Sequence, residues 1–397
     1  MQVSFLKNNL KQFHLVDNKT ANNKKCTNTA LSINLSNDPL SIYNRSLINF
    51  SSRQKEILIP EKRFEGCLLG GAIGDALGAP IEFSKYIGIQ KEFGKKGVQG
   101  FESFQGFKTD ITDDTQMTMF TADGLISSSD TQNEEIILKH IFESYKKWLI
   151  TQESKNIPKN TKGWLANNDK LYSRRSPGVT CISSIKSGAY GSMECPINDK
   201  KGSGGLMRVA PIGLKYYKDP EFAFKIACKC AAMTHGNPDG FLPAGVFAGI
   251  IAYLTQGEDL NTAILKASEI LIKYKNHQNT LEKITFAKQQ LDIDSKDPFA
   301  IAKIGKGWVA DEALGIAIYC ALKYENDFTN GIIASINHGG DSDTTGAITG
   351  NILGAKLGAE TIPENWIKNI CLSDEIKMLS SDLFKKSDEI EEFDLKY

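Results

Sequence analysis

Apolar positions recur at helical spacing through most of the chain after residue 60. In residues 133–150, NEEIILKHIFESYKKWLI, the side chains of Ile137, Ile141, Tyr145 and Trp148 fall on or near one face. Strand-like alternation of apolar and polar residues is almost absent. We therefore predict an all-α fold, a compact multi-helix bundle. Its further helices are expected at 61–83, 112–127, 219–235, 240–254, 259–292 (two helices), 309–324 and 328–337, with a last one in the charged C-terminal segment.

Two segments of the chain carry glycine at every fourth position. Residues at this interval share one side of a helix, and each interior glycine costs about 1 kcal/mol relative to alanine. Two such stripes therefore predict two buried helices that pack closely, with acidic residues at their rims, and Pro80 should end the first just before Glu82. The stripes are Gly66, Gly70, Gly74 and Gly78, and Gly346, Gly350, Gly354 and Gly358.

The chain divides by composition at about residue 60. Residues 1–60 are rich in Asn, Ser, Lys and Thr, and we predict a polar N-terminal extension, either a poorly ordered tail or an arm that binds a partner. Residues 61–397 are predicted to form one domain. Within it, residues 84–108 are rich in Gly and Lys and are expected to form a loop, and residues 151–203 are the least regular part.

Composition narrows the class of protein. The 397 residues contain 47 Lys+Arg and 47 Asp+Glu, so the formal net charge is zero, which argues against a global attraction to nucleic acid or to a membrane surface. The N-terminus has no apolar core of the signal-peptide type. The eight cysteines are scattered without a CxxC pair, which is typical of reduced thiols in a cytoplasmic protein.

Two clusters of acids and hydroxyls stand at predicted helix starts far apart in the chain. The first is Thr112-Asp113-Asp114, and the second is Asp341-Ser342-Asp343-Thr344. Either cluster alone is typical of a helix N-cap. If the glycine stripes bring both together, four carboxylates, with Glu82 as a fifth, repel one another unless cations neutralise them. Hard oxygen ligands favour Mg²⁺ or Mn²⁺ over zinc, and two such ions would balance the charge.

Five blocks in this order resemble the ADP-ribosylglycohydrolase family over about residues 61–360: GCLLGGAIGDALGAPIEF, ITDDTQMTM, GGLMRVAPIGL, THGNP and NHGGDSDTTGAITGNILGA. That family includes the dinitrogenase reductase activating glycohydrolase and hydrolases of ADP-ribosyl-arginine and ADP-ribosyl-serine. The resemblance implies an all-α fold with a centre of two Mg²⁺ or Mn²⁺ ions. The residues at the family's metal-ligand positions are Thr112, Asp113, Asp114, Asp341, Asp343 and Thr344.

The resemblance also implies a substrate site. Ser203, Gly204 and Gly205 fall in the glycine loop near the ADP-ribose phosphates, His235 falls at a position that lines the cleft, and Gly339 and Gly340 are expected to contact substrate. Glu82 falls where relatives carry a glutamate that contacts the metal or gates the site.

Two positions depart from the family's pattern, and the first is Ser203, which stands in the glycine loop where asparagine is common. Ser176 stands where the nitrogenase-regulating relative has a catalytic carboxylate, so Glu82 or Asp114 is expected to serve instead. Arg208 lies near the glycine loop and could meet a phosphate or a buried acid, of which we favour the acid.

The implied activity is hydrolysis that removes ADP-ribose from a modified protein side chain, with arginine as the favoured linkage. An alternative is an immunity protein that binds an ADP-ribosylating toxin, or its target, through residues 1–60. A structural relative with an inactive site and an enzyme acting on free ADP-ribosyl metabolites are two further possibilities. The ADP-ribosylated substrate, and in the second case a cognate toxin, are the expected partners.

Overall fold

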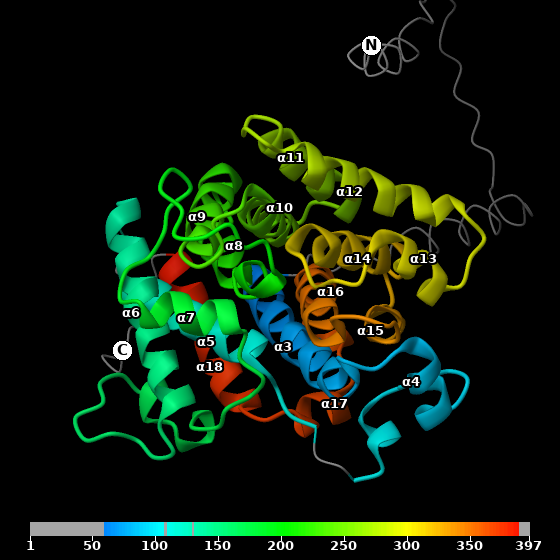
Figure 1. Cartoon of the computed structure of the whole chain (residues 1–397), viewed down its shortest axis with the longest axis horizontal. Helices are drawn as coiled ribbons and strands as arrows, with labels where there is room; N and C mark the ends of the chain where they lie inside the picture. Colours follow the sequence, from blue (N-terminus) through cyan, green and yellow to red (C-terminus); the bar gives the residue numbers. More distant parts are fainter. Residues whose placement is uncertain (1–58, 107–108, 129–130, 389–397) are drawn as a thin grey trace, which may run out of the picture. The chain divides into compact units, whose positions relative to one another are not determined.

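A computed structural model describes residues 59–106, 109–128 and 131–388 of the chain. The described residues contain α-helices and short 3₁₀ helices and no β-strand, which confirms the predicted all-α fold (Figure 1). The proposed N-terminal arm lies outside the described residues, so its role stays a prediction. The predicted domain boundary at residue 60 also stays a prediction, although the first described helix, α3, begins at that residue.

The two glycine-striped segments form α3 (Pro60–Gly78) and α16 (Ser342–Leu357), which lie side by side (Figure 1). A Cβ atom added at Gly66 would lie 2.5 Å from the carbonyl oxygen of Gly354, and one at Gly78 would lie 2.5 Å from the backbone nitrogen of Asp343. The first glycine of α3 thus faces the end of α16, so the helices run antiparallel with their backbones in contact. This confirms the predicted close packing.

The antiparallel register positions the acidic residues. Because Gly78 packs against Ser342 and Asp343, the C-terminal end of α3 meets the N-terminal end of α16. A 3₁₀ turn (Ala79–Ile81) follows α3 and delivers Glu82 to the same place. Pro80 lies in this turn, as predicted from its inability to continue the helix.

Most other helices lie where the apolar spacing predicts them, and several of their starts carry a side-chain cap. Thr112, Asn133 and Asp219 each accept a hydrogen bond from a backbone N–H in the first turn of the following helix. The helices are α5 (Asp113–Ser127), α6 (Glu134–Glu153), α7 (Val179–Lys186), α8 (Ala210–Lys215), α9 (Pro220–Ala232), α10 (Pro238–Thr255), α11 (Leu260–Leu271), α12 (Gln278–Gln289), α14 (Ala310–Lys323), α15 (Phe328–Ile336), α17 (Glu364–Asn369) and α18 (Ser373–Ser387).

Three of the described helices, α4, α8 and α13, were not predicted. Helix α4 (Tyr86–Phe93) occupies part of the expected loop at 84–108, and α13 (Asp297–Ile304) precedes α14. Helices α4 and α13 are each eight residues long, and only Ile89 of α4 is buried. A helix with so little buried surface leaves a weak periodic signal.

Helix α10 is the most apolar element of the bundle. Among the described residues it alone is long and apolar enough to cross a membrane, with a mean hydropathy of 1.2 over 18 residues. In the structure, however, 89% of that window is buried inside the protein, where α10 packs against α9 and α11. This burial is typical of a core helix.

Candidate active site

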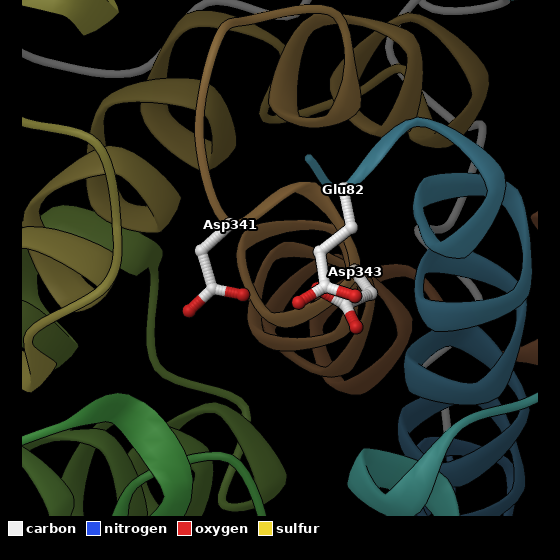
Figure 2. Close-up of side chains that lie close together, drawn as sticks. All are labelled: Glu82, Asp341 and Asp343. Carbon is white, nitrogen blue, oxygen red and sulfur yellow. The ribbon is translucent and has the colours of Figure 1, made fainter. Parts of the chain in front are cut away.

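Three carboxylates meet where α3 ends and α16 begins. One carboxylate oxygen from each of Glu82, Asp341 and Asp343 lies within 4.8 Å of the other two, and Figure 2 shows the carboxylate of Glu82 reaching toward that of Asp343 with Asp341 beside them. Asp341 is the N-cap residue of α16, and its backbone N–H donates to the carbonyl oxygen of Lys306 at 2.7 Å. Asp343 accepts a hydrogen bond from the backbone N–H of Thr344 at 2.9 Å.

The first acid–hydroxyl cluster stands at the start of α5. Thr112 is the N-cap, and its hydroxyl accepts from the backbone N–H of Asp114 at 3.2 Å. Asp113 accepts at 3.0 Å from the backbone N–H of Gly178, in the loop that contains Ser176. One oxygen of Asp114, Oδ2, is buried and has no hydrogen-bond partner. A buried, unpartnered carboxylate oxygen is costly, and this oxygen is free to coordinate a cation.

A further acid, Asp75, was not predicted. It lies between Gly74 and Gly78 on α3 and is fully buried. Its carboxylate accepts hydrogen bonds from the backbone N–H groups of Thr112 and Thr115 and from the hydroxyl of Thr115. Asp75 therefore holds the start of α5 against α3. An aspartate inside an otherwise apolar and glycine-rich helix was the signal that could have identified it.

The two clusters interact electrostatically. Burial, and then the charge of Asp343, raises the pKa of Asp75 to about 7 and that of Glu82 to about 9. Burial also raises the pKa of Asp113 to about 8, with Asp343 adding to the effect. Burial, and secondly the charge of Asp343, raises the pKa of Asp114 well above its usual range. The acids that stand far apart in sequence therefore act on one another electrostatically.

These acids fit divalent cations. Of the described residues, no Lys, Arg or His forms an ion pair with Asp75, Glu82 or any acid of the two clusters, so no basic side chain in this part of the chain neutralises them. The surrounding ligand atoms are carboxylate and hydroxyl oxygens, which hard cations such as Mg²⁺ and Mn²⁺ prefer. His338 is buried and its Nε2 lies 2.8 Å from the hydroxyl of Thr345. Asp113 and Asp114 lie outside the 4.8 Å group, and their sharing of metal ions with that group stays a prediction.

The glycine loop is bound to the acidic cluster. The hydroxyl of Ser203 donates to Oδ2 of Asp341 at 2.8 Å, and the backbone N–H of Ser203 donates to the carbonyl oxygen of Trp308 at 3.3 Å. Gly204 and Gly205 follow in a 3₁₀ turn. The loop thus lies beside the carboxylates, where the resemblance expects the phosphates of ADP-ribose.

His235 lies behind this loop. A Cβ atom at Gly204 would lie 3.1 Å from its ring, and one at Gly205 would lie 3.3 Å from its Nδ1. The ring is 2% exposed, and burial, with the charge of Arg208, lowers its pKa to about 3. In this structure His235 supports the loop as a neutral ring. Its predicted contact with substrate has no support in this placement and stays a prediction.

The remaining predicted residues occupy different surroundings. Gly340 is buried and packs tightly against the carbonyl group of Lys306, whereas Gly339 is exposed beside the backbone of Tyr86. Thr344 is buried in the first turn of α16. Gly340 is therefore required for packing, and Gly339 is the one of the two glycines that a substrate could reach.

The prediction that Arg208 pairs with a buried acid was wrong. Arg208 is fully buried, so it is not available to a phosphate in the cleft, and no described carboxylate forms an ion pair with it. Its guanidinium lies 4.4 Å from the ring centroid of Tyr145 and donates to the hydroxyl of Thr234 at 2.8 Å and to the carbonyl of Cys230 at 3.1 Å. A cation–π contact and neutral acceptors thus replace the expected acid.

The family model for ADP-ribosylglycohydrolases matches residues 58–392. The chain belongs to this family. It is 26% identical to the ADP-ribosylhydrolase ARH3 of Bos taurus, covering 82% of this chain and 94% of that one. It is 23% identical to the ADP-ribosyl-[dinitrogen reductase] glycohydrolase of Rhodospirillum rubrum, covering 77% and 89%. Membership establishes a hydrolase that removes ADP-ribose.

A solved structure has the same fold. The chain aligns with an ADP-ribosylglycohydrolase-related protein complex at a TM-score of 0.57 and 20% identity, over 83% of this chain and 99% of that one. The fold and family expected from the motifs are thus confirmed.

Proposed function

We propose that this ADP-ribosylglycohydrolase removes ADP-ribose from modified protein side chains, with ADP-ribosyl-arginine as its substrate. The observation that carries the proposal is the convergence of Glu82, Asp341 and Asp343 beside the loop at Ser203. The arginine linkage is favoured by the SPGVTC and GGLMRVAPIGL segments, which resemble bacterial members that reverse arginine ADP-ribosylation.

Two Mg²⁺ or Mn²⁺ ions would be held by carboxylates of the two clusters, with Thr112 and Thr344 as neutral oxygen ligands. When bound, such ions neutralise the carboxylates and grip and polarise the ribose diol next to the scissile bond. The unpartnered Oδ2 of Asp114 and the absence of a protein cation beside the described acids support this assignment.

Glu82 is the candidate for proton transfer at the anomeric centre. It is half-buried, whereas Asp113, Asp114, Asp341 and Asp343 are each 3–4% exposed, so Glu82 is the acid that a substrate reaches first. A carboxyl group at this place can give a proton to the leaving group or take one from the attacking water. Asp114 is the alternative, although its buried position suits a metal ligand better.

The loop from Gly202 to Gly205 would receive the pyrophosphate. It has no bulky side chain, and phosphate oxygens can approach the backbone N–H groups of such a loop closely. The hydroxyl of Ser203 donates a hydrogen bond to Asp341, so the same residue orients a carboxylate and positions the loop. This hydrogen bond would fix the loop that receives the phosphates relative to the carboxylates beside the ribose.

Release of ADP-ribose tests the proposal. The purified chain, with Mg²⁺ or Mn²⁺, is incubated with arginine-ADP-ribosylated and serine-ADP-ribosylated proteins, and free ADP-ribose is measured. We expect release from the arginine-linked substrate that EDTA abolishes and added metal restores. Release from the serine-linked substrate alone would refute the arginine assignment, and no release from either by the metallated protein would refute the activity.

A further inference from the structure

An exposed aromatic pair lies next to the acidic cluster. The ring of Phe83 stacks on that of Trp308, with centroids 5.5 Å apart and planes 15° from parallel. Phe83 is 78% exposed and Trp308 is 39% exposed. Each ring covers part of the other, yet both keep apolar surface in water. Exposed apolar groups of this size gathered beside a site are typical of an interaction surface.

The pair joins the two sides of the candidate active site. Phe83 directly follows Glu82 in sequence. Trp308 accepts a hydrogen bond from the backbone of Ser203 and directly follows Gly307, whose added Cβ would lie 3.1 Å from that of Asp341. The stacked rings are therefore continuous with the carboxylates on one side and with the glycine loop on the other.

Two lysines flank the aromatic pair. Lys85 lies two residues after Phe83, and Lys306 lies two residues before Trp308. Both are exposed, and neither forms an ion pair with any residue that the structure describes. Many other lysines of the bundle do pair, for example Lys147 with Asp123 at 3.0 Å. The surface thus combines an apolar centre with two positive charges that have no described partner.

We propose that Phe83, Trp308, Lys85 and Lys306 form a docking surface for the polypeptide of the ADP-ribosylated substrate. The segment that binds there lies next to the modified residue, covers the aromatic pair with an apolar side chain and places Asp or Glu opposite the lysines. The inference rests on the proposed function. When the ADP-ribose of a modified side chain enters the acidic site, the backbone of that residue must pass over this docking surface. Charge complementarity then selects acidic flanking residues.

Kinetics with a protein and a small-molecule substrate test the aromatic pair. Phe83→Ala and Trp308→Ala are compared with wild type on an arginine-ADP-ribosylated protein and on free ADP-ribosyl-arginine. We expect KM for the protein to rise about tenfold, as for an aromatic anchor at an interface, with little change for the small molecule. Phe286→Ala, which removes a 38%-exposed aromatic from α12, serves as the control. Equal losses on both substrates would overturn the proposal, since the rings would then belong to the ADP-ribose site.

Peptides with different flanks test the lysines. Binding of two fluorescent ADP-ribosylated peptides, identical except for Glu or Lys beside the modified residue, is measured alongside turnover. We expect wild type to prefer the Glu peptide and the Lys85→Glu/Lys306→Glu variant to prefer the Lys peptide. The Lys155→Glu/Lys275→Glu variant changes two exposed lysines elsewhere and should behave as wild type.

The two proposals fail in different ways. A preference for the Glu peptide without any turnover would refute the proposed function and retain the docking surface. Turnover with no difference between the peptides, and no reversal in the lysine variant, would refute the docking surface and retain the function.

Discussion

Asp75 accepts hydrogen bonds from the backbone N–H of Thr112 through both of its carboxylate oxygens, at 3.1 and 2.9 Å. It also accepts from the backbone N–H of Thr115 at 3.1 Å. Through these bonds the glycine-striped α3 fixes the N-terminal end of α5. The positions of Asp113 and Asp114 therefore depend on a residue that need not contact substrate or metal.

Replacing Asp75 with Asn should destabilise the protein. The amide keeps one acceptor oxygen, but its NH₂ group faces backbone donors, so at least one buried N–H loses its partner. We expect the free energy of unfolding in Mg²⁺ to fall by about 2 kcal/mol, measured by urea denaturation. Asp294→Asn, at an exposed site, is the control. An unchanged unfolding midpoint for Asp75→Asn would contradict this role.

The contact between α3 and α16 should not tolerate a methyl group. A Cβ atom at Gly350 would lie 2.5 Å from the carbonyl carbon of Gly70 and 3.1 Å from the nitrogen of Gly71, and backbone cannot yield as a side chain can. We expect Gly350→Ala to lower the free energy of unfolding by about 2 kcal/mol or more and to reduce soluble expression.

Gly88→Ala is the matched control for that substitution. Gly88 lies inside α4, and a Cβ atom there would meet nothing within 4 Å. Because alanine favours a helix over glycine by about 1 kcal/mol, Gly88→Ala should leave stability unchanged or raise it. If both alanine variants had the same thermal midpoint, close backbone contact would not be what the glycine stripe provides.

The parts of the fold that sequence predicted are those with a repeated signal. The glycine stripes recur every four residues, so they predicted both helices and the fact that they touch. The acids that stand in pairs at helix starts, such as Asp113 and Asp114, were also visible. Asp75 stands alone, and only the tertiary contact with Thr112 reveals its role. The hydrogen bond between Ser203 and Asp341, which are 138 residues apart, could not be predicted from any local sequence pattern either.

Partners of buried charges were the least predictable feature. A basic residue near a glycine loop suggested an acid opposite Arg208, but the structure stacks the guanidinium on Tyr145. The surroundings of His235 were equally hard to predict, because a histidine after a helix can face a cleft or support a loop. Sequence gives the residue type, whereas burial and the facing atoms decide what that residue does.

Metal-free protein should lose stability as pH rises. The pKa values of Asp75, Asp113 and Glu82 are raised to about 7, 8 and 9, whereas in an unfolded chain Asp and Glu titrate near 3.9 and 4.3. Between about pH 4 and pH 9 the folded state therefore holds more protons than the unfolded state, and the free energy of unfolding falls with increasing pH.

Mg²⁺ should reverse this trend, because cations replace the protons. Thermal midpoints measured at pH 5.5 and pH 8.5, with EDTA and with Mg²⁺, check the prediction. We expect the increase caused by Mg²⁺ to be larger at pH 8.5. An equal increase at both values would mean that the cluster does not exchange protons for metal.

Glu82→Gln and Asp114→Asn should separate proton transfer from metal binding. Glu82 is half-buried at the edge of the cluster, so its amide isostere should keep the fold and the binding of ADP-ribose. Loss of a general acid or base costs about 10²–10⁴ in rate, and we expect kcat to fall by about 100-fold or more without recovery in excess Mg²⁺. Asp114 is 3% exposed with an unpartnered Oδ2, so Asp114→Asn should chiefly weaken metal binding, and excess Mg²⁺ should restore part of kcat.

Metal affinity from isothermal titration, and kcat as a function of Mg²⁺ concentration, distinguish the two roles. Glu92→Gln, at an exposed glutamate on α4, controls for the chemical change and should match wild type. Recovery of the Glu82→Gln variant by metal, with none for Asp114→Asn, would exchange the assignments, because the residue whose loss metal cannot compensate is the one that moves the proton.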